Sequence, residues 1–178
     1  MGDRIIFEQK IETLVEMIQQ LHDRLRLEMK QKWDRTLPLD ELLSNRWDSA
    51  RKIGFGEGSS IYHNSYIYGD VKVGKNTWIG PFTILDGSGG LTIGDYCSIS
   101  AGVQIYSHDS VAWAISGGKD HYEYAPTIIG SRCYIGPNTV IGKGVNLGDG
   151  TIVGANSFVN RSFPSDSRIA GNPAITIG

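Results

Sequence analysis

The side chains best suited to chemistry gather in one short segment, residues 107–127. His108 is accompanied there by acidic and aromatic residues: Asp109, Trp113, Asp120, His121, Tyr122, Glu123 and Tyr124. Carboxylates accept hydrogen bonds from hydroxyl groups, and aromatic rings stack on the apolar faces of sugars. A neutral imidazole near pH 7 can take the proton of a hydroxyl group and so make its oxygen a better nucleophile. The segment therefore predicts a site for a hydroxylated substrate, with His108 at its entrance.

The elements that must position this segment are short repeats. Aliphatic residues recur every six positions, at Ile61, Ile67, Val73, Ile79 and Leu85, then, after a two-residue insertion, at Ile93, Ile99 and Ile105, and beyond the segment at Ile129, Ile135, Ile141, Leu147, Val153 and Val159. A period of six does not fit an α-helix, and an ordinary two-sided strand would alternate for longer before turning. Short strands with a corner every six residues predict a triangular prism, in which three hexads form one coil and the coils stack.

Two other positions in the hexads support the prism. The residue after the aliphatic one is often glycine, as at Gly80, Gly94 and Gly136, and we assign these glycines to corners with unusual backbone angles. The fifth residue is small or β-branched and suits a narrow interior. Cys97 and Cys133 hold this position, so we expect them to be neighbouring, reduced core residues.

The segment 107–127 interrupts the repeat without changing its register, which predicts a loop projecting from the prism. Counting hexads places Leu85 and Ile105 on the same face of neighbouring coils, so Asp86 lies on the edge from which the loop emerges. Irregular loops on a rigid scaffold are where functional sites concentrate. We therefore expect the acceptor to contact Asp86 together with Trp113 and Tyr124.

Residues 1–52 lack the repeat and are predicted to be helical. Apolar residues there are spaced three and four apart, as on one face of a helix, at Ile11, Leu14, Ile18, Leu21 and Leu25. Pro38 fits the first turn of a second short helix that runs through Trp47, which we expect to cover the open end of the coils. The predicted organisation is a capping helical segment, residues 1–52, followed by a mainly β domain of parallel coils, residues 53–178.

Composition excludes several classes of partner. Seventeen Lys and Arg against nineteen Asp and Glu give a net charge of −2, so a broad positive surface for nucleic acid or anionic membranes is not expected. The first residues lack an apolar signal core, and long apolar runs are missing elsewhere, so we expect a soluble, cytoplasmic protein. Two cysteines are too few and too far apart for a zinc motif or a disulfide scaffold.

The hexads and the segment Tyr-Ser-His-Asp, which ends at Asp109, resemble the hexapeptide-repeat acyltransferases, whose coils form a left-handed parallel β-helix. Within that family the similarity is greatest to the sugar and maltose O-acetyltransferases and to the acetyltransferases of polysaccharide biosynthesis. The resemblance implies that His108 is the general base and that the protein is a homotrimer whose 107–127 loop reaches a neighbouring site. A carboxylate would orient the imidazole, with Asp86, Asp109 and Glu123 as candidates.

The resemblance also implies acetyl-CoA as co-substrate and no metal. The run Tyr-Ile-Gly-Pro-Asn is similar to the coil that holds the pantetheine arm, and Val-Gly-Ala-Asn-Ser-Phe-Val-Asn-Arg is similar to the CoA-binding coil. The cofactor contacts that these runs imply are Tyr134, Gly136, Gly154, Ala155 and Arg161. Pro137 has no N–H, so an amide donor expected there is missing.

Taken with the residues of the loop, the resemblance implies an acetyl-CoA-dependent O-acetyltransferase acting on a sugar, a nucleotide sugar or a surface-polysaccharide unit. The near alternatives are an amino-sugar N-acetyltransferase and an antibiotic acetyltransferase. A metal-dependent carbonic anhydrase-like β-helix would need three converging histidines, yet His63 and His108 fall in hexads about two coils apart. A non-catalytic assembly module, using the N-terminal helix, is the remaining alternative.

Overall fold

The computed structural model describes residues 2–178, and the chain divides into two compact units, Met1–Asn45 and Arg46–Gly178. The sequence-based boundary after residue 52 falls inside α3 (Arg46–Ile53), which belongs to the second unit. Helix α3 lies there because it packs against the first strand, β1 (Ser60–Ile61).

The first unit holds the long helix α1 (Gly2–Trp33), which contacts the single-turn helix α2 (Leu39–Leu42). Pro38 is the N-cap of α2, close to its predicted place. The predicted helix through Trp47 is wrong in extent, because α2 ends at Leu42 and α3 begins at Arg46. It is α3 that packs on the first strand of the coils. Within residues 2–178, no helix combines the length and the apolar character that crossing a membrane requires.

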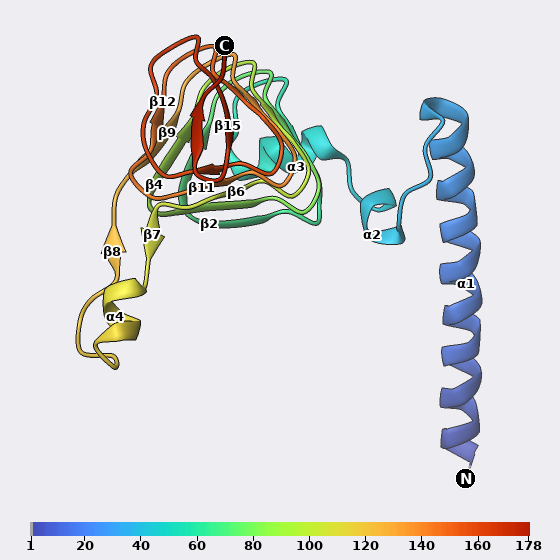
Figure 1. Cartoon of the computed structure of the whole chain (residues 1–178). Coiled ribbons are helices and arrows are strands. Elements are labelled where there is room, and N and C mark those ends of the chain that lie inside the picture. The colour runs from blue at the N-terminus through green and yellow to red at the C-terminus, as the bar shows by residue number, and fades with distance from the viewer. Residues whose placement is uncertain (1) are drawn as a thin grey trace. The chain divides into compact units, whose positions relative to one another are not determined.

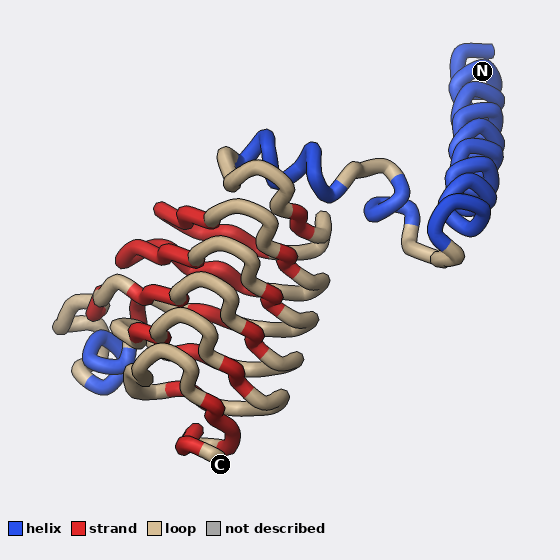
Figure 2. Tube along the Cα trace, turned by 90° about the horizontal axis from the view of Figure 1, so that it is seen from above, coloured by secondary structure: helices blue, strands red, loops and turns tan. Residues whose placement is uncertain are grey.

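The second unit is a parallel β-helix, which confirms the predicted fold class. One face stacks β1, β3 (Trp78–Ile79), β5 (Ser98–Ile99), β10 (Tyr134–Ile135), β13 (Ile152–Val153) and β15 (Arg168–Gly171). The next face stacks β2 (Tyr66–Val73), β4 (Ile84–Ile93), β6 (Gln104–Ile105), β11 (Val140–Ile141) and β14 (Phe158–Val159). Figures 1 and 2 show these strands aligned across the stacked coils.

The third face and the C-terminal end complete the prism. Strands β2 and β4 continue round a corner onto this face, where β9 (Thr127–Ile129) pairs with β4 and with β12 (Asn146–Leu147). At the last coil, β16 (Ala174–Thr176) pairs antiparallel with β15. The antiparallel strand covers the free edge of the final coil, which would otherwise be open to pairing.

The interior follows the six-residue pattern. Ile79, Ile99 and Ile135 stand in register on neighbouring coils and are fully buried. The fifth position of each hexad also points inward, and Cys97 and Cys133 are buried, free and adjacent there, as predicted. Regular stacking of apolar side chains therefore fixes the register of each coil on the one before it.

The predicted reason for the glycines after the aliphatic positions is wrong. Gly80, Gly94 and Gly136 do not have positive φ angles. The residue with a positive φ lies two positions further along each corner, as at Asn138 (φ 57°). A Cβ on Gly136 would lie 2.6 Å from the backbone nitrogen of Ala155 in the next coil. These glycines are thus required by the close approach of neighbouring coils, and asparagine tolerates the left-handed corner.

Candidate active site

Residues 107–127 leave the prism after β6 and return at β9, which confirms the predicted loop. Its two ends form an antiparallel ribbon of β7 (His108–Asp109) and β8 (Glu123–Tyr124), with helix α4 (Val111–Ile115) between them (Figure 1). The ribbon pairs His108 with Tyr124 and Asp109 with Glu123. At its base the Ala125 N–H donates to the Ser107 carbonyl at 2.9 Å. His108 is therefore held on an ordered ribbon.

His108 meets Asp86 at the foot of this ribbon. The His108 Nδ1 and an Asp86 carboxylate oxygen are 2.6 Å apart. Asp86 follows Leu85 in β4, and Leu85 pairs with Ile105 of β6, so the stacking register brings the carboxylate under the point where the loop begins. The other two candidate orienting carboxylates, Asp109 and Glu123, contact Lys143 instead.

The carboxylate of Asp86 is only 1% exposed but is surrounded by donors. One oxygen accepts from the Ser88 hydroxyl at 2.5 Å and the Ser88 N–H at 3.1 Å, and the other accepts from the Ser107 N–H at 3.0 Å. Burial alone would raise the pKa of Asp86, but these bonds and the one to His108 together lower it to about 2. Asp86 is thus a fixed negative charge, and its burial does not fit the expected direct contact with an acceptor.

Two aromatic rings pack against the imidazole of His108. Tyr124 stacks on the imidazole with ring centroids 5.8 Å apart, and Tyr122 does so at 6.1 Å. Trp113 of α4 contacts Tyr122 edge-on at 5.7 Å, and both Trp113 and Tyr124 remain exposed. The expected acceptor residues Trp113 and Tyr124 therefore lie in one cluster with His108, to which Tyr122 must be added.

A pocket of about 420 Å³ opens beside His108. Its lining comes from the ribbon and from the next two coils: Tyr106, His108, Asp109, Ser110, Val111, Val140, Gly142, Lys143 and Phe158. Val140 and Phe158 are the outward neighbours of the buried Ile141 and Val159, so the hexad pattern could have located them. An imidazole, a lysine and apolar walls suit a reactive end group on an apolar arm.

The predicted cofactor residues lie on two edges of the prism. Gly136 and Ala155 touch each other on neighbouring coils, and Tyr134 and Gly154 lie beside them, at the corner before β11 and β14. Arg161 lies at the corner after β14 and stacks on Phe163, with its guanidinium 5.2 Å from the ring. That corner is on the edge that carries the ribbon, which we call the loop edge (residues 86–90, 106–126, 142–144 and 160–162).

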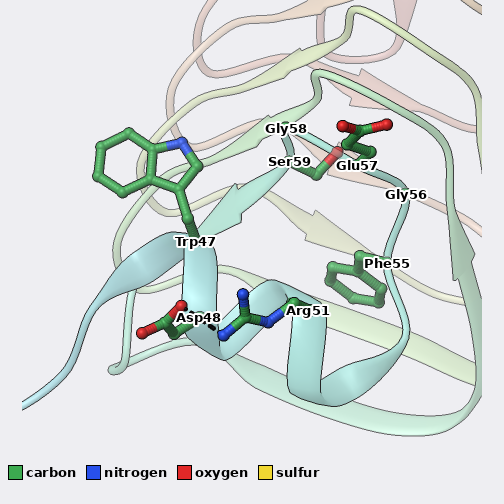
Figure 3. Close-up of a pocket in the computed structure, with 8 residues that line it drawn as sticks. All are labelled: Trp47, Asp48, Arg51, Phe55, Gly56, Glu57, Gly58 and Ser59. Atoms are coloured by element: carbon green, nitrogen blue, oxygen red, sulfur yellow. Dashed lines mark hydrogen bonds and ion pairs between the residues drawn. The ribbon is translucent and has the colours of Figure 1, made fainter.

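A second pocket, of about 370 Å³, lies beside α3 at the first coil (Figure 3). Figure 3 shows Trp47, Asp48 and Arg51 around it, with the Arg51–Asp48 ion pair at 2.8 Å. Its lining holds no histidine or cysteine, and its two carboxylates are Asp48, which pairs with Arg51, and Glu57. Among the side chains that the structure describes, those of residues 6–178, no cluster of three or more His, Cys, Asp or Glu is placed to hold a metal ion.

Two parts of the β-helix match known repeat families. Residues 126–161 match the bacterial transferase hexapeptide with six repeats, and residues 70–107 match the hexapeptide repeat of succinyl-transferase. WcaF of Escherichia coli K12, provisionally described as a colanic acid biosynthesis acetyltransferase, is 31% identical over 123 residues, which are 60% of this chain and 68% of WcaF.

Solved structures share the fold. The hexapeptide-repeat acetyltransferase VCA0836 of Vibrio cholerae is 25% identical, with a TM-score of 0.56 over 92% of this chain and 91% of that one. AntD of Bacillus cereus, an N-acyltransferase crystallised with dTDP and 3-hydroxybutyryl-CoA, is 23% identical, with a TM-score of 0.60 over 75% of this chain and 89% of AntD. The sequence match to WcaF goes beyond a common fold, and the chain belongs to the hexapeptide-repeat acetyltransferase family.

Proposed function

We propose that the protein is an acetyl-CoA-dependent O-acetyltransferase acting on a sugar, a nucleotide sugar or a surface-polysaccharide unit, with His108 as general base. The observation that carries the proposal is the 2.6 Å contact between His108 and the buried Asp86, beside a pocket that opens on the loop edge. A histidine with one ring nitrogen fixed by a carboxylate is poised to use the other as a base.

The chemistry follows from this geometry. Asp86, ionised at neutral pH, accepts the Nδ1–H of His108, which leaves Nε2 to receive a proton. As Nε2 takes the proton of the acceptor hydroxyl, the hydroxyl oxygen attacks the thioester carbonyl carbon. The C–S bond then breaks, and the CoA sulfur leaves and takes the proton from Nε2, which returns His108 to its neutral form. The acceptor becomes an acetyl ester, and Asp86 stabilises the imidazolium without itself changing protonation state.

The surrounding residues supply binding in this account. Trp113, Tyr122 and Tyr124 would stack on the sugar acceptor, while the pocket walls of Val140 and Phe158 would take the thioester end of acetyl-CoA. Arg161, further along the loop edge, would contact the nucleotide phosphates. In its complex, VCA0836 binds acetyl-CoA, which supports this choice of co-substrate. Acetyl-CoA chemistry of this kind agrees with the expected cytoplasmic location.

A second copy of the chain is needed to use the remaining cofactor residues. Tyr134, Gly136, Gly154 and Ala155 lie on a different edge from His108, with the β11 and β14 face between them. A homotrimer would bring this edge of one subunit to the loop edge of the next, and Gly136 and Ala155 present little side chain to an approaching arm. Light scattering tests this arrangement, and a monomer mass at micromolar concentration would contradict it.

The acceptor class is supported by WcaF, whose description places it in the biosynthesis of a polysaccharide. The experiment is a screen of neutral sugars, amino sugars and their nucleotide derivatives, measuring thiol release from acetyl-CoA. Hydroxylamine treatment of the product separates a labile ester from a stable amide. Ester formation that His108→Gln abolishes is the expected result. Amide formation alone would indicate an N-acetyltransferase, and no thiol release by folded wild type would contradict acetyl transfer to these acceptors.

A further inference from the structure

Two carboxylates face each other across the ribbon that carries His108. Asp109 of β7 pairs directly with Glu123 of β8, one rung beyond the pair His108 and Tyr124. Like charges opposite each other on antiparallel strands destabilise the pairing. The residue pair that includes His108 therefore lies next to a pair of carboxylates that repel each other unless a positive charge lies between them.

Lys143 provides that charge from the next coil. Its Nζ lies 2.7 Å from an Asp109 oxygen and forms a second ion pair with Glu123, and its side chain is only 22% exposed. The hydrogen bond to Lys143 lowers the pKa of Asp109. The hydrogen bonds to Asp109 and, to a lesser degree, to Glu123 raise the pKa of Lys143. The Asp109–Lys143 pair therefore stays charged at neutral pH.

The backbone that carries Lys143 is itself tied to the base of the ribbon. The Gly144 N–H donates to the Thr127 hydroxyl at 3.1 Å, and that hydroxyl donates to the Tyr106 carbonyl at 2.7 Å. Gly144 has a positive φ of 75°, and a Cβ there would meet the Ala125 side chain at 3.2 Å. The lysine thus extends from a firm corner, directly below the place where the ribbon joins the prism.

We propose that Lys143 is a positioning residue: it neutralises the facing carboxylates Asp109 and Glu123, clamps the β7–β8 ribbon to the next coil, and so holds His108 against Asp86. This deepens the proposed function, since it concerns how the general base is kept in place. Asp109 and Glu123 then affect His108 only through the ribbon. This role accounts for the presence of two acidic residues beside His108 that pair with Lys143 and not with the imidazole.

A lysine that lines the pocket could instead bind an anionic group of CoA, and the two roles are separable. If Lys143 clamps the ribbon, loss of Lys143 leaves Asp109 and Glu123 repelling each other, and removing the charge of Glu123 relieves that repulsion. If it binds an anion of the cofactor, neutralising Glu123 restores nothing. The informative variants are Lys143→Gln, Lys143→Arg, and Lys143→Gln combined with Glu123→Gln. Lys72→Gln is the matched control, because Lys72 forms an exposed ion pair with Asp70 on β2, outside the site.

The readouts use the full chain without ligand. Hydrogen exchange at the Ala125 amide reports opening of the ribbon, and the His108 Nδ1–H proton resonance reports its short bond to Asp86. Lys143→Gln should speed Ala125 exchange by roughly three- to thirtyfold, as for the loss of two partly exposed ion pairs, and should broaden or shift the histidine resonance. The double variant lacks the repulsion between Asp109 and Glu123 but also lacks the clamp, so it should recover part of the change in exchange and in the histidine resonance. Lys143→Arg and Lys72→Gln should resemble wild type.

Turnover with an acceptor found in the sugar screen is the second readout. Lys143→Gln should lower kcat by roughly tenfold to a hundredfold, as expected when a catalytic group moves by about 1 Å, with CoA affinity little changed. The proposal is overturned if Lys143→Gln leaves exchange and the histidine resonance as in wild type, or if Glu123→Gln fails to rescue it. Hydrogen exchange is measured without an acceptor and without turnover. It therefore tests the role of Lys143 in holding the ribbon even if His108 is not the general base.

Discussion

The coils and the ribbon of residues 107–127 are held in place by different kinds of interaction. In the coils, Ile79, Ile99 and Ile135 repeat one apolar contact from layer to layer. The ribbon depends on a few polar contacts, each made once: His108 with Asp86, and Lys143 with Asp109 and Glu123. The scaffold is therefore redundant and the site is not, so changes in the coils should cost stability, whereas changes at the ribbon should cost activity.

The largest expected effect is a loss of turnover at Asp86, which should far exceed the loss at the ribbon carboxylate Asp109. Asp86→Asn should lower turnover by about 10² to 10⁴, because the imidazole loses the carboxylate that fixes its tautomer. Steady-state kinetics with saturating acetyl-CoA measures the loss. Asp109→Asn removes a carboxylate that contacts Lys143 and should cost much less. Equal losses in the two variants would remove the distinction between the orienting carboxylate and the ribbon carboxylates.

A change in the coils should have the opposite character. Ile129→Ala empties a buried position and should lower the free energy of unfolding by about 2 to 5 kcal/mol, while turnover per folded molecule is retained. Ile128→Ala, one residue earlier and 41% exposed, is the control and should cost less than about 1 kcal/mol. Urea unfolding at fixed protein concentration measures both. Similar costs at the two positions would contradict the inward and outward assignment.

Acid should weaken the fold at the site through Asp86. The pKa of Asp86 is lowered from 3.8 to about 2 in the folded protein. Its contribution to the free energy of unfolding is therefore fully present at pH values above 3.8 and is lost as the pH falls through about 2. The contribution is about 2 kcal/mol. Unfolding free energies of wild type and Asp86→Asn, measured from pH 6 to pH 2, should converge by about that amount. Parallel curves would mean that Asp86 is not stabilised as a carboxylate.

The smallest effect is expected at the aromatic cluster. Trp113→Ala removes an exposed ring that contacts Tyr122 but not His108, so the acceptor KM should rise about two- to tenfold with kcat little changed. Kinetics over a range of acceptor concentrations separates the two parameters. A fall in kcat without a change in KM would place Trp113 in the chemical step instead.

The fold was predictable because it repeats. A period of six in Ile, Leu and Val defines the strands, and counting hexads from Leu85 to Ile105 is enough to bring Asp86 to the edge that carries His108. The role of the corner glycines was not predictable, since spacing alone does not distinguish a positive φ from a close approach. The choice among the three carboxylates and the part played by Lys143 depend on how a non-periodic loop folds back, which the repeat does not encode.

The most direct test of the account is the turnover of His108→Ala under saturating substrates, measured beside its CoA affinity and melting temperature. A general base that is removed costs about 10² to 10⁴ in rate, whereas a packing histidine would chiefly alter stability. The account predicts that loss with CoA affinity and melting temperature close to those of wild type. A folded His108→Ala protein that keeps more than about a tenth of wild-type turnover, with chemistry rate-limiting, would contradict it.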